Sequence, residues 1–364
     1  MKRNHVTIVG GGMVGLALAN TLAQTHIIVD LYEHQPPHLD FIPGTGTRVS
    51  ALNLQSRNLL DSLGVWKQLR APAIAPVTEI IAWTHTHSGS VQFAAVDIGR
   101  RYLAFIVENR EIQRVLWQMA MANSHITIHT ERIDKLPASH LVVGADGGNS
   151  QVRLLAGINV KERAYGQHAI VATVHTTLPH QQYAYQNFLK TGPLGVLPLA
   201  DANTVSIVWS ADDAYAHELM SLDEMNFNIA LSNAFDLKLG KLTLMSERYL
   251  FPLIRRHAEH YIKPGIALVG DAAHTIHPLA GQGVNLGFKD IIELAKQLKI
   301  AKDKQQSFAS LSTLRKYERS RKTDNTLMLT MMQLFRDNGY QFGGLFNLVN
   351  NIKWLRKKFM MLSQ

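Results

Sequence analysis

Hydrophobic residues near the start of the chain follow three patterns in succession. Residues 6–9 form a short run rich in β-branched side chains, residues 16–23 place apolar side chains at helical spacing, and residues 27–32 are again apolar and β-branched. A cluster of glycines separates the first run from the second. A strand, a turn, a helix and a second strand in this order predict a β-α-β unit.

The same reasoning predicts further elements. Apolar residues recur at helical intervals from residue 48 to 69, which predicts a first long helix that starts near Ala51 and ends at Gly64. Other helical patterns cover residues 108–122, about 283–300 and the stretch from 313 onward. Short apolar runs predict buried strands at 140–144 and 266–269, and alternating runs predict antiparallel strands at about 72–105 and 169–210.

With 364 residues the chain is long enough for a discontinuous domain with a second domain inserted in it. The predicted fold class is therefore α/β, with a Rossmann-like dinucleotide-binding domain, an inserted antiparallel sheet and C-terminal helices. We assign residues 1–71, 106–165 and 255–320 to the dinucleotide-binding domain, 72–105 and 166–254 to an inserted substrate-binding sheet, and 321–364 to a C-terminal helical tail.

The composition narrows the chemistry. The absence of cysteine excludes disulfides, iron–sulfur clusters and a thiolate nucleophile. The formal net charge is +9, and the basic residues gather late in the chain, at Arg315, Lys316, Arg319, Arg321, Lys322, Lys353, Arg356, Lys357 and Lys358. Such runs form either a solvated helical face or a surface for an anionic membrane or a biosynthetic partner protein, and we expect no nucleic acid partner.

The N-terminus resembles a targeting segment at first sight. Lys2 and Arg3 precede an uncharged stretch, residues 6–23, as in a secretory signal or a short membrane span. Four glycines would make a poor apolar helix there, whereas a strand, a turn and a helix account for the stretch. No other segment approaches the roughly 20 apolar residues that a membrane helix needs. We therefore expect a cytoplasmic protein, either free or peripheral at the inner face of the membrane.

The glycine cluster fits a dinucleotide-binding turn. Gly10 permits a tight turn, Gly12 lets the backbone approach a pyrophosphate at the helix N-terminus, and Gly15 lets the helix pack closely on the strand. Glu33 follows at the end of the second strand, where its carboxylate can accept hydrogen bonds from ribose hydroxyls. The motif predicts dinucleotide binding and does not distinguish FAD from NAD.

Two more strand ends carry an acidic residue. The run 141–144 leads into Asp146, which alone could be an ordinary strand-to-loop junction. The run 267–270 leads into Asp271, whose carboxylate would lie at the carboxyl edge of a sheet and could bind a ribityl hydroxyl. Residues 281–283 then open a helix, whose free N–H groups favour the negative charge of a reduced flavin.

Together the three segments resemble the signature of the flavoprotein aromatic hydroxylases, typified by para-hydroxybenzoate hydroxylase, in which they bind FAD. The stretch 277–287 (HPLAGQGVNLG), followed by Asp290, is similar to the mark of the ubiquinone-biosynthesis hydroxylases. Residues 107–110 (VENR) and 192–199 (GPLGVLPL) are also similar to that family. The resemblance runs from the first strand to about residue 320.

The resemblance implies roles for individual positions. Arg48 corresponds to an arginine near the FAD phosphates, Asn109 to a contact of the ribityl or pyrophosphate region, and Asp271 to the ribityl-binding aspartate. The family usually has an acidic residue two positions before Arg48, where this chain has Gly46. The complete set of expected FAD-binding residues is Gly10, Gly12, Gly15, Glu33, Arg48, Asn109, Arg110, Gln113, Asp146, Asp271, Gly281, Gly283 and Asn285.

The resemblance also implies a reaction: a flavin monooxygenase that hydroxylates a polyprenylphenol intermediate of ubiquinone biosynthesis through a C4a-hydroperoxyflavin. NAD(P)H would reduce the bound FAD and, since there is one glycine fingerprint, would bind transiently without a Rossmann domain of its own. Pro278, Gly281 and Gly283 would surround the isoalloxazine ring, and we assign no catalytic acid or base. Apolar residues of the inserted sheet, each of which could equally be a core residue, are the substrate candidates: Tyr185, Phe188, Pro193, Leu194 and Pro198.

Two alternatives stay open at this point. The chain could be a related FAD oxidoreductase of the prenyl reductase or halogenase type, although no Trp-x-Trp-x-Ile-Pro run typical of halogenases is present. It could also be a non-catalytic FAD-binding subunit of a biosynthetic assembly. His274 and His277 are not at the spacing of metal ligands near a carboxylate cluster, and we expect no metal site.

Overall fold

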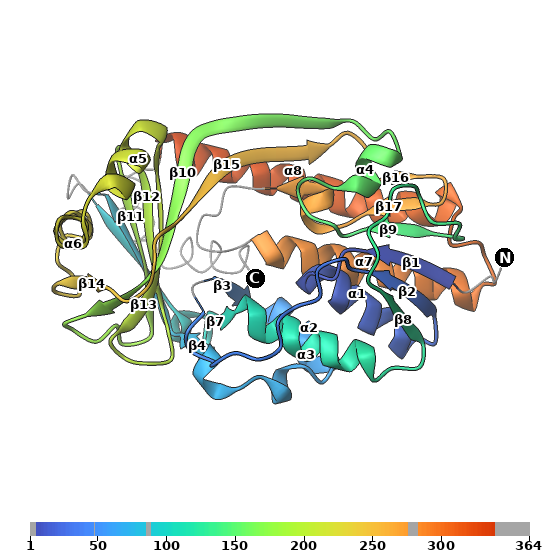
Figure 1. Cartoon of the computed structure of the whole chain (residues 1–364), viewed down its shortest axis with the longest axis horizontal. Helices are drawn as coiled ribbons and strands as arrows, with labels where there is room; N and C mark the ends of the chain where they lie inside the picture. Colours follow the sequence, from blue (N-terminus) through green and yellow to red (C-terminus); the bar gives the residue numbers. More distant parts are fainter. Residues whose placement is uncertain (1–4, 47, 85–88, 276–282, 339–364) are drawn as a thin grey trace.

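The computed structural model describes residues 5–46, 48–84, 89–275 and 283–338. It contains two large sheets side by side and a small sheet between them (Figure 1). Pro278 and Gly281 lie outside the described residues, as do residues 353–358 of the basic tail.

The first sheet has six strands in the order β16-β17-β9-β1-β2-β8. All neighbours are parallel except β16 and β17. The predicted β-α-β unit is confirmed, because α1 connects the parallel strands β1 and β2. The strands are β1 (His5–Val9), β2 (Ile28–Tyr32), β8 (Ile126–His129), β9 (Val142–Gly144), β16 (Ile262–Lys263) and β17 (Ile266–Leu268).

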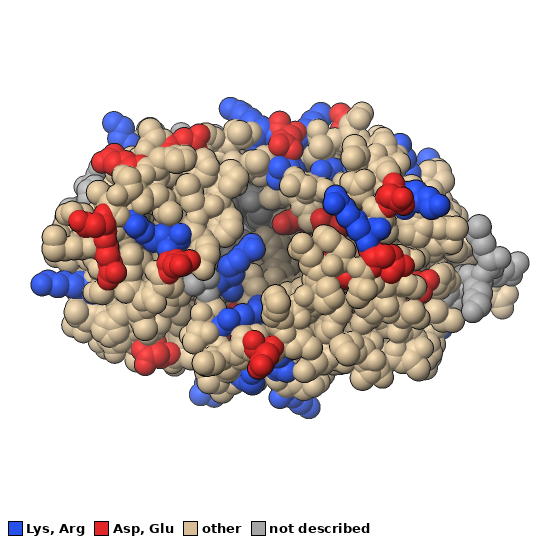
Figure 2. Space-filling model, in the orientation of Figure 1, with Lys and Arg blue, Asp and Glu red and all other residues tan. Residues whose placement is uncertain are grey.

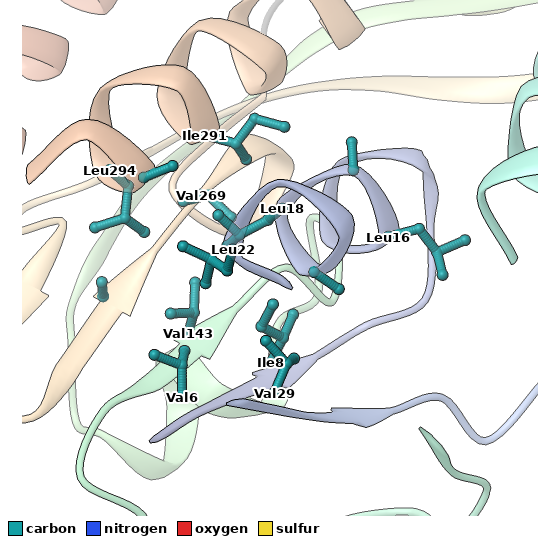
Figure 3. Packing of buried hydrophobic residues seen from close by; sticks show 14 of the residues in the cluster. Val6, Ile8, Leu16, Leu18, Leu22, Val29, Val143, Val269, Ile291 and Leu294 are labelled. Atoms are coloured by element: carbon teal, nitrogen blue, oxygen red, sulfur yellow. The ribbon is translucent and has the colours of Figure 1, made fainter. Parts of the chain in front are cut away.

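Helices cover this sheet and bury its apolar side chains. Figure 3 shows Leu18 and Leu22 of α1 above the sheet residues Ile8 and Val143, with Ile291 of α7 on their other side. All five are fully buried, so the helical spacing read from the sequence corresponds to the core face of each helix. The helices of this part are α1 (Met13–Gln24), α3 (Asn109–Met121), α4 (Gln151–Leu155), α7 (Gly283–Asp303) and α8 (Leu311–Asn338).

The second sheet has nine strands and confirms the predicted antiparallel region, except that β5 and β11 pair in parallel. Its order is β18-β15-β10-β13-β12-β11-β5-β6, with β14 paired to β10. Two helices that the sequence analysis did not predict, α5 (Asp213–Ser221) and α6 (Glu224–Ala234), lie on its outer face (Figure 1). The strands are β5 (Glu79–Thr84), β6 (Ser90–Ala94), β10 (Val160–Thr176), β11 (Tyr183–Leu189), β12 (Gly192–Pro198), β13 (Thr204–Asp212), β14 (Leu242–Leu244), β15 (Tyr249–Ala258) and β18 (His274–Thr275).

A third sheet corrects one prediction. It consists of β3 (Val49–Asn53), β7 (Ala104–Glu108) and β4 (Ile74–Val77), in that order. The helix predicted to start near Ala51 is wrong at its beginning, because residues 49–53 pair with β7. The helix α2 (Leu54–Ser62) starts only after Asn53, whose side chain accepts a hydrogen bond from the Ser56 N–H at 2.9 Å. Short 3₁₀ helices lie at Trp66–Gln68, Ala71–Ala73, Ala95–Ile98 and Gly270–Ala272.

Two long strands join the two parts. The proposed domain boundary at residue 165 falls within β10, and the one at residue 254 falls within β15. Both strands continue across these boundaries without a break. Helix α8 likewise continues through residue 321, and Arg321 is buried. The division into domains therefore remains a proposal. Among the described residues, no helix combines the length and the apolar character needed to cross a membrane.

Candidate FAD-binding site

The three acidic or glycine-rich motifs meet at one edge of the parallel sheet. β1, β9 and β17 are neighbours, with Val9 level with Gly144 and Gly144 level with Leu268. Each strand ends directly before its motif. Because the carboxyl ends of parallel strands lie at the same sheet edge, the three motifs lie at that edge. Ligands of open α/β sheets bind at this edge.

Close backbone packing brings the first and third motifs together at Val14, in the first turn of α1. A Cβ added to Gly270 would lie 3.3 Å from a methyl of Val14, and one added to Gly287 would lie 2.6 Å from the other methyl. Glycine at position 287 therefore lets α7 approach α1. The N-termini of both helices are held at the same edge of the sheet.

The glycine fingerprint divides into packing positions and an open position. Gly10 has φ +111°, and a Cβ there would lie 2.3 Å from the carbonyl oxygen of Ala145. A Cβ on Gly15 would lie 1.9 Å from the carbonyl oxygen of Gly10. At Gly12, the N-cap of α1, and at Gly283, the first residue of α7, an added Cβ meets no heavy atom of the described residues within 4 Å. Within the part of the chain that the structure describes, these two helix N-termini thus have the space that a bound anionic cofactor requires.

Glu33 lies beside the fingerprint as predicted from its spacing. Its carboxylate accepts hydrogen bonds from the N–H of Gly11 at 2.6 Å and of Gln35 at 2.8 Å. The Gln113 side chain donates to the carbonyl of Gly11 at 2.8 Å. Glu33 and Gln113 therefore fix the turn from two sides. A carboxylate, helix N-termini and open glycines are the donor and acceptor set that suits a dinucleotide, so FAD fits these residues.

Asp146 has protein partners for its carboxylate. It accepts hydrogen bonds from the hydroxyl of Ser150 at 2.5 Å and from the N–H groups of Gln151 at 2.6 Å and Val152 at 3.0 Å. These contacts cap the N-terminus of α4. The FAD contact expected for Asp146 remains a prediction, and the structure adds a folding role for it.

Arg153 joins the second and third motifs, a role that the sequence analysis missed. Its guanidinium donates to the carbonyl of Gly148 at 2.7 Å and to that of Ala272 at 2.9 Å. Burial lowers the pKa of Arg153, although Asp146 and Glu162 oppose this shift. A buried guanidinium between two turn carbonyls fixes the distance between the turns. Its position after an acidic strand end was the available signal.

Asp271 projects from the turn that begins at Gly270, whose φ of +58° suits glycine. The residue is reached by solvent, yet the surrounding protein raises the pKa of its carboxyl group, while His274 and Arg48 oppose the rise. Figure 2 shows a hollow between the two parts of the molecule, with lysine and arginine side chains on its rim.

Asn285 is satisfied by the protein. Its amide donates to the carbonyl of Ala51 at 2.7 Å and accepts from the N–H of Asn53 at 3.1 Å and the hydroxyl of Ser56 at 2.6 Å. It therefore fastens the start of α7 to the junction of β3 and α2. Contact of its side chain with FAD remains a prediction.

Arg48 and Asn109 lie beside each other at the junction of β3 and β7. The N–H of Asn109 donates to the Arg48 carbonyl at 3.1 Å, and its side-chain oxygen accepts from the Ser50 hydroxyl at 2.7 Å. The exposed guanidinium of Arg48 lies over the ring of Phe251 in β15 of the nine-stranded sheet, 5.2 Å from the centre of the ring. Arg48 is thus available at the boundary between the two parts.

The glycine at position 46 has a physical reason. The buried carboxylate of Glu108 accepts a hydrogen bond from the Gly46 N–H at 2.9 Å, and its other oxygen lies 3.2 Å from Arg110 Nε. A Cβ at position 46 would lie 2.9 Å from that carboxylate. Glu108 therefore supplies a carboxylate here and leaves no room for an acidic side chain at 46. Arg110 also donates to the carbonyl of Ile42 at 2.8 Å.

The five substrate candidates separate by the alternation of the strands. Tyr185 and Leu194 belong to the hydrophobic core under α5 and α6, and Pro198 lies on the same face as Leu194. Phe188 and Pro193 are paired across β11 and β12 on the opposite face, which Figure 1 shows turned toward the parallel sheet. The prediction of substrate contact narrows to these two residues.

The described residues contain no group of three or more histidine or acidic side chains that could hold a metal ion. His274 lies in a buried pair with Asp290, with 2.5 Å between Nε2 and a carboxylate oxygen. His277 is outside the described residues.

Solved structures share this arrangement of sheets. The p-nitrophenol 4-monooxygenase PnpA of Pseudomonas putida matches with a TM-score of 0.76 and 17% identity over 98% of this chain and 96% of that one. PqsL of P. aeruginosa, in complex with 2-aminobenzoylacetate, matches with a TM-score of 0.77 and 19% identity over 99% of both chains. The fold is that of the FAD-dependent aromatic hydroxylases. A flavin-dependent halogenase, CmlS, also shares it, at a TM-score of 0.72, 17% identity and 98% of this chain and 68% of that one, so the fold alone leaves the reaction open.

Sequence comparison is more specific. A family model described as an FAD binding domain matches residues 128–330. The 3-demethoxyubiquinol 3-hydroxylase of Escherichia coli is 35% identical over 379 residues, covering 99% of this chain and 94% of the relative. The mitochondrial ubiquinone biosynthesis monooxygenase COQ6 of Homo sapiens is 32% identical, covering 91% and 84%. The chain belongs to this family of FAD-dependent ubiquinone-biosynthesis hydroxylases, and it is an FAD-dependent monooxygenase.

Proposed function

We propose that this protein hydroxylates the aromatic ring of a polyprenylphenol intermediate of ubiquinone biosynthesis, with FAD as bound cofactor and NAD(P)H and O₂ as co-substrates. The relatives named for ubiquinone biosynthesis support the substrate class, since they match nearly the whole chain. The name of the bacterial relative specifies a 3-hydroxylase, and that of the mitochondrial relative specifies no ring position.

The observation that carries the proposal is the inner face of the large sheet. Ala184 and Leu197 on this face pack against the small sheet, and Phe188 and Pro193 are further apolar residues on it, with Gln186 between Ala184 and Phe188. The apolar residues of this face, opposite the FAD site, suit an aromatic ring with a polyprenyl chain. Side chains on it would hold the ring by apolar contact and exclude water from the reaction.

The chain's own contribution to the chemistry is electrostatic. Bound FAD, once reduced by NAD(P)H, supplies the electrons that activate oxygen. The open N-terminus of α7 at Gly283 presents N–H groups, and these favour negative charge placed near them. Gly283 would therefore assist reduction of the flavin. The nicotinamide would bind transiently, because one fingerprint serves the resident FAD.

Product analysis tests the proposal. Expression of this chain in a strain that lacks one ubiquinone hydroxylase should restore quinone synthesis, and mass spectrometry should show one added oxygen in the accumulated phenol. Stopped-flow absorbance at the flavin band should show reduction by NAD(P)H that a phenolic ligand accelerates. If the bound flavin stays oxidised with NAD(P)H and phenols present, the hydroxylase proposal fails.

We further propose that the basic residues late in the chain bring the enzyme to an anionic membrane, where its greasy substrate resides. Arg315, Lys316 and Arg319 are exposed on α8, whereas Arg321 is buried, so the interpretation of the first run as a solvated face holds only in part. Flotation with anionic liposomes should fall when Lys353, Arg356, Lys357 and Lys358 are changed to glutamine. Equal flotation of both proteins, at low and high salt, would refute this role.

A further inference from the structure

A cluster of buried polar side chains lies directly behind the turn that carries Asp271. Asp290 of α7 is fully buried, and His274, Arg321 and Asn325 around it are at most 3% exposed. Charged groups are rarely buried unless they are paired and hydrogen-bonded. The FAD-binding roles assigned above use none of these four side chains.

The carboxylate of Asp290 has four partners. One oxygen accepts a hydrogen bond from the backbone N–H of Gly270 at 3.0 Å and lies 2.5 Å from Nε2 of His274. The other accepts from Nε of Arg321 at 2.9 Å and from the amide of Asn325 at 3.2 Å. Every acceptor position of the carboxylate is therefore used.

Asp290 and its partners come from four separate elements. Gly270 begins the turn after β17, His274 lies in β18, Asp290 in α7, and Arg321 with Asn325 in α8. A further hydrogen bond of 2.7 Å runs from Arg321 to the side-chain oxygen of Asn325 and holds the guanidinium in place. Helix α8 is thus connected to the turn of the FAD site through one buried carboxylate.

A purely structural role would explain the cluster if all the partners of Asp290 were side chains. Buried ion pairs add little net stability compared with apolar residues of the same volume. Here the carboxylate also binds the N–H of Gly270, whose left-handed backbone directly precedes Asp271. The same contact holds the start of the turn against α7, whose N-terminus is the second helix end that faces the cofactor.

We propose that Asp290 is a positioning residue for the flavin, and that Arg321 and Asn325 make α8 part of the FAD site. Asp290 holds the Gly270 N–H so that the Asp271 carboxylate points at the ribityl chain, at a fixed distance from the N-terminus of α7. The inference rests on FAD binding, and it is independent of the substrate proposed above.

The test is Asp290→Asn in the full-length holoenzyme. The amide nitrogen of asparagine donates, so one side of the cluster would bring two donors together and the turn would shift. We expect the FAD dissociation constant to rise about 10- to 100-fold, as for the loss of a charge-assisted hydrogen bond. The midpoint potential of the flavin should become more negative, and hydrogen exchange of the amides at 270–275 should accelerate.

Two matched variants separate positioning from stability. Asp324→Asn removes the exposed carboxylate that also binds Arg321, at 2.7 Å, and does not touch the turn. Leu298 is fully buried and belongs to α7, the helix of Asp290. Leu298→Ala therefore leaves a cavity beside α7 and should lower the melting temperature without moving the turn. Both should keep the wild-type potential and FAD affinity when measured at an equal distance below their melting temperatures.

Asp290→Asn leaves Arg321 with only the exposed carboxylate of Asp324 as its partner charge, so the double variant Asp290→Leu with Arg321→Met serves if the single variant does not fold. It removes both charges together with the acceptor for the Gly270 N–H. Weaker FAD binding and a more negative potential in whichever variant folds support the proposal. An unchanged potential and affinity, with only the melting temperature lowered, would overturn it. Because these measurements need no phenol, their failure is distinct from a failure of the proposed hydroxylation.

Discussion

Replacing Gly12 with alanine should separate FAD binding from folding. Gly12 has ordinary extended backbone, with φ −72° and ψ 178°, and an added Cβ meets no heavy atom within 4 Å. Alanine is a poorer N-cap than glycine by about 0.5–1 kcal/mol, but it restricts the unfolded chain, which returns about 0.4–1 kcal/mol. The free energy of unfolding of the FAD-free protein should therefore change by less than about 1 kcal/mol.

The same methyl group would occupy the place where a pyrophosphate approaches α1. If it keeps phosphate oxygens from two backbone N–H groups, at about 1.5 kcal/mol for each charge-assisted hydrogen bond, binding loses about 3 kcal/mol. This corresponds to a roughly 100-fold higher dissociation constant for FAD. Titration of the FAD-free protein, followed by quenching of flavin fluorescence, measures it, and chemical denaturation measures the stability.

Gly64→Ala is the matched control. A Cβ at Gly64 also meets open space, but the residue has φ +80° at the end of α2, away from the FAD segments. The strain should lower stability by about 1 kcal/mol and leave FAD affinity unchanged. An FAD dissociation constant of the Gly12→Ala protein within about threefold of wild type would refute the assignment of Gly12 as the place where the pyrophosphate approaches α1.

Three further substitutions have directions set by the structure. Burial alone would raise the pKa of Glu111, but hydrogen bonds from Arg114 and Arg70 outweigh this effect and lower the pKa to about 2. The folded state therefore loses up to about 3 kcal/mol as the pH falls from 4.5 to 2, and Glu111→Gln should flatten this loss in denaturation curves. Burial lowers the pKa of His257 to about 4. Protonation is thus disfavoured in the folded state, and stability should fall by about 1–2 kcal/mol from pH 6.5 to 4 in wild type but not in His257→Asn, after allowance for its partial exposure. Phe188→Ala should lower kcat/KM for the phenol about tenfold, from about 1.5 kcal/mol of apolar contact, whereas Tyr185→Phe on the helix side should not.

The sequence predicts well the segments where local pattern and tertiary context agree. β1, α1 and β2 follow directly from the change of hydrophobic period around the fingerprint. The motifs after β9 and β17 could be placed on strand ends because each follows a short buried run. Their meeting at one sheet edge then follows from parallel pairing, which the register at Gly144 confirms.

Other features depend on partners far away in the sequence. Residues 49–53 have helical spacing but form β3, because β7 offers backbone hydrogen bonds more than 50 positions later. Arg321 reads as one charge of a basic run and is buried, because Asp290 lies opposite it across two helices. Spacing along a single segment contains neither fact. The alternation of β11 and β12 was visible, but the face covered by α5 and α6 was not.

Residues of one signature divide by where their hydrogen-bonding capacity is used. Asp146 and Asn285 each have three protein partners, so their loss should be felt first in folding. At Gly12 and Gly283 no atom of the residues 5–46, 48–84, 89–275 and 283–338 stands where a side chain would be, so their substitution should affect cofactor binding first. A signature match assigns all four to FAD alike. Only the count of hydrogen-bond partners in the folded protein separates residues that hold the site together from residues that leave space for the cofactor. Substitution experiments on this family therefore need to measure both folding stability and FAD affinity.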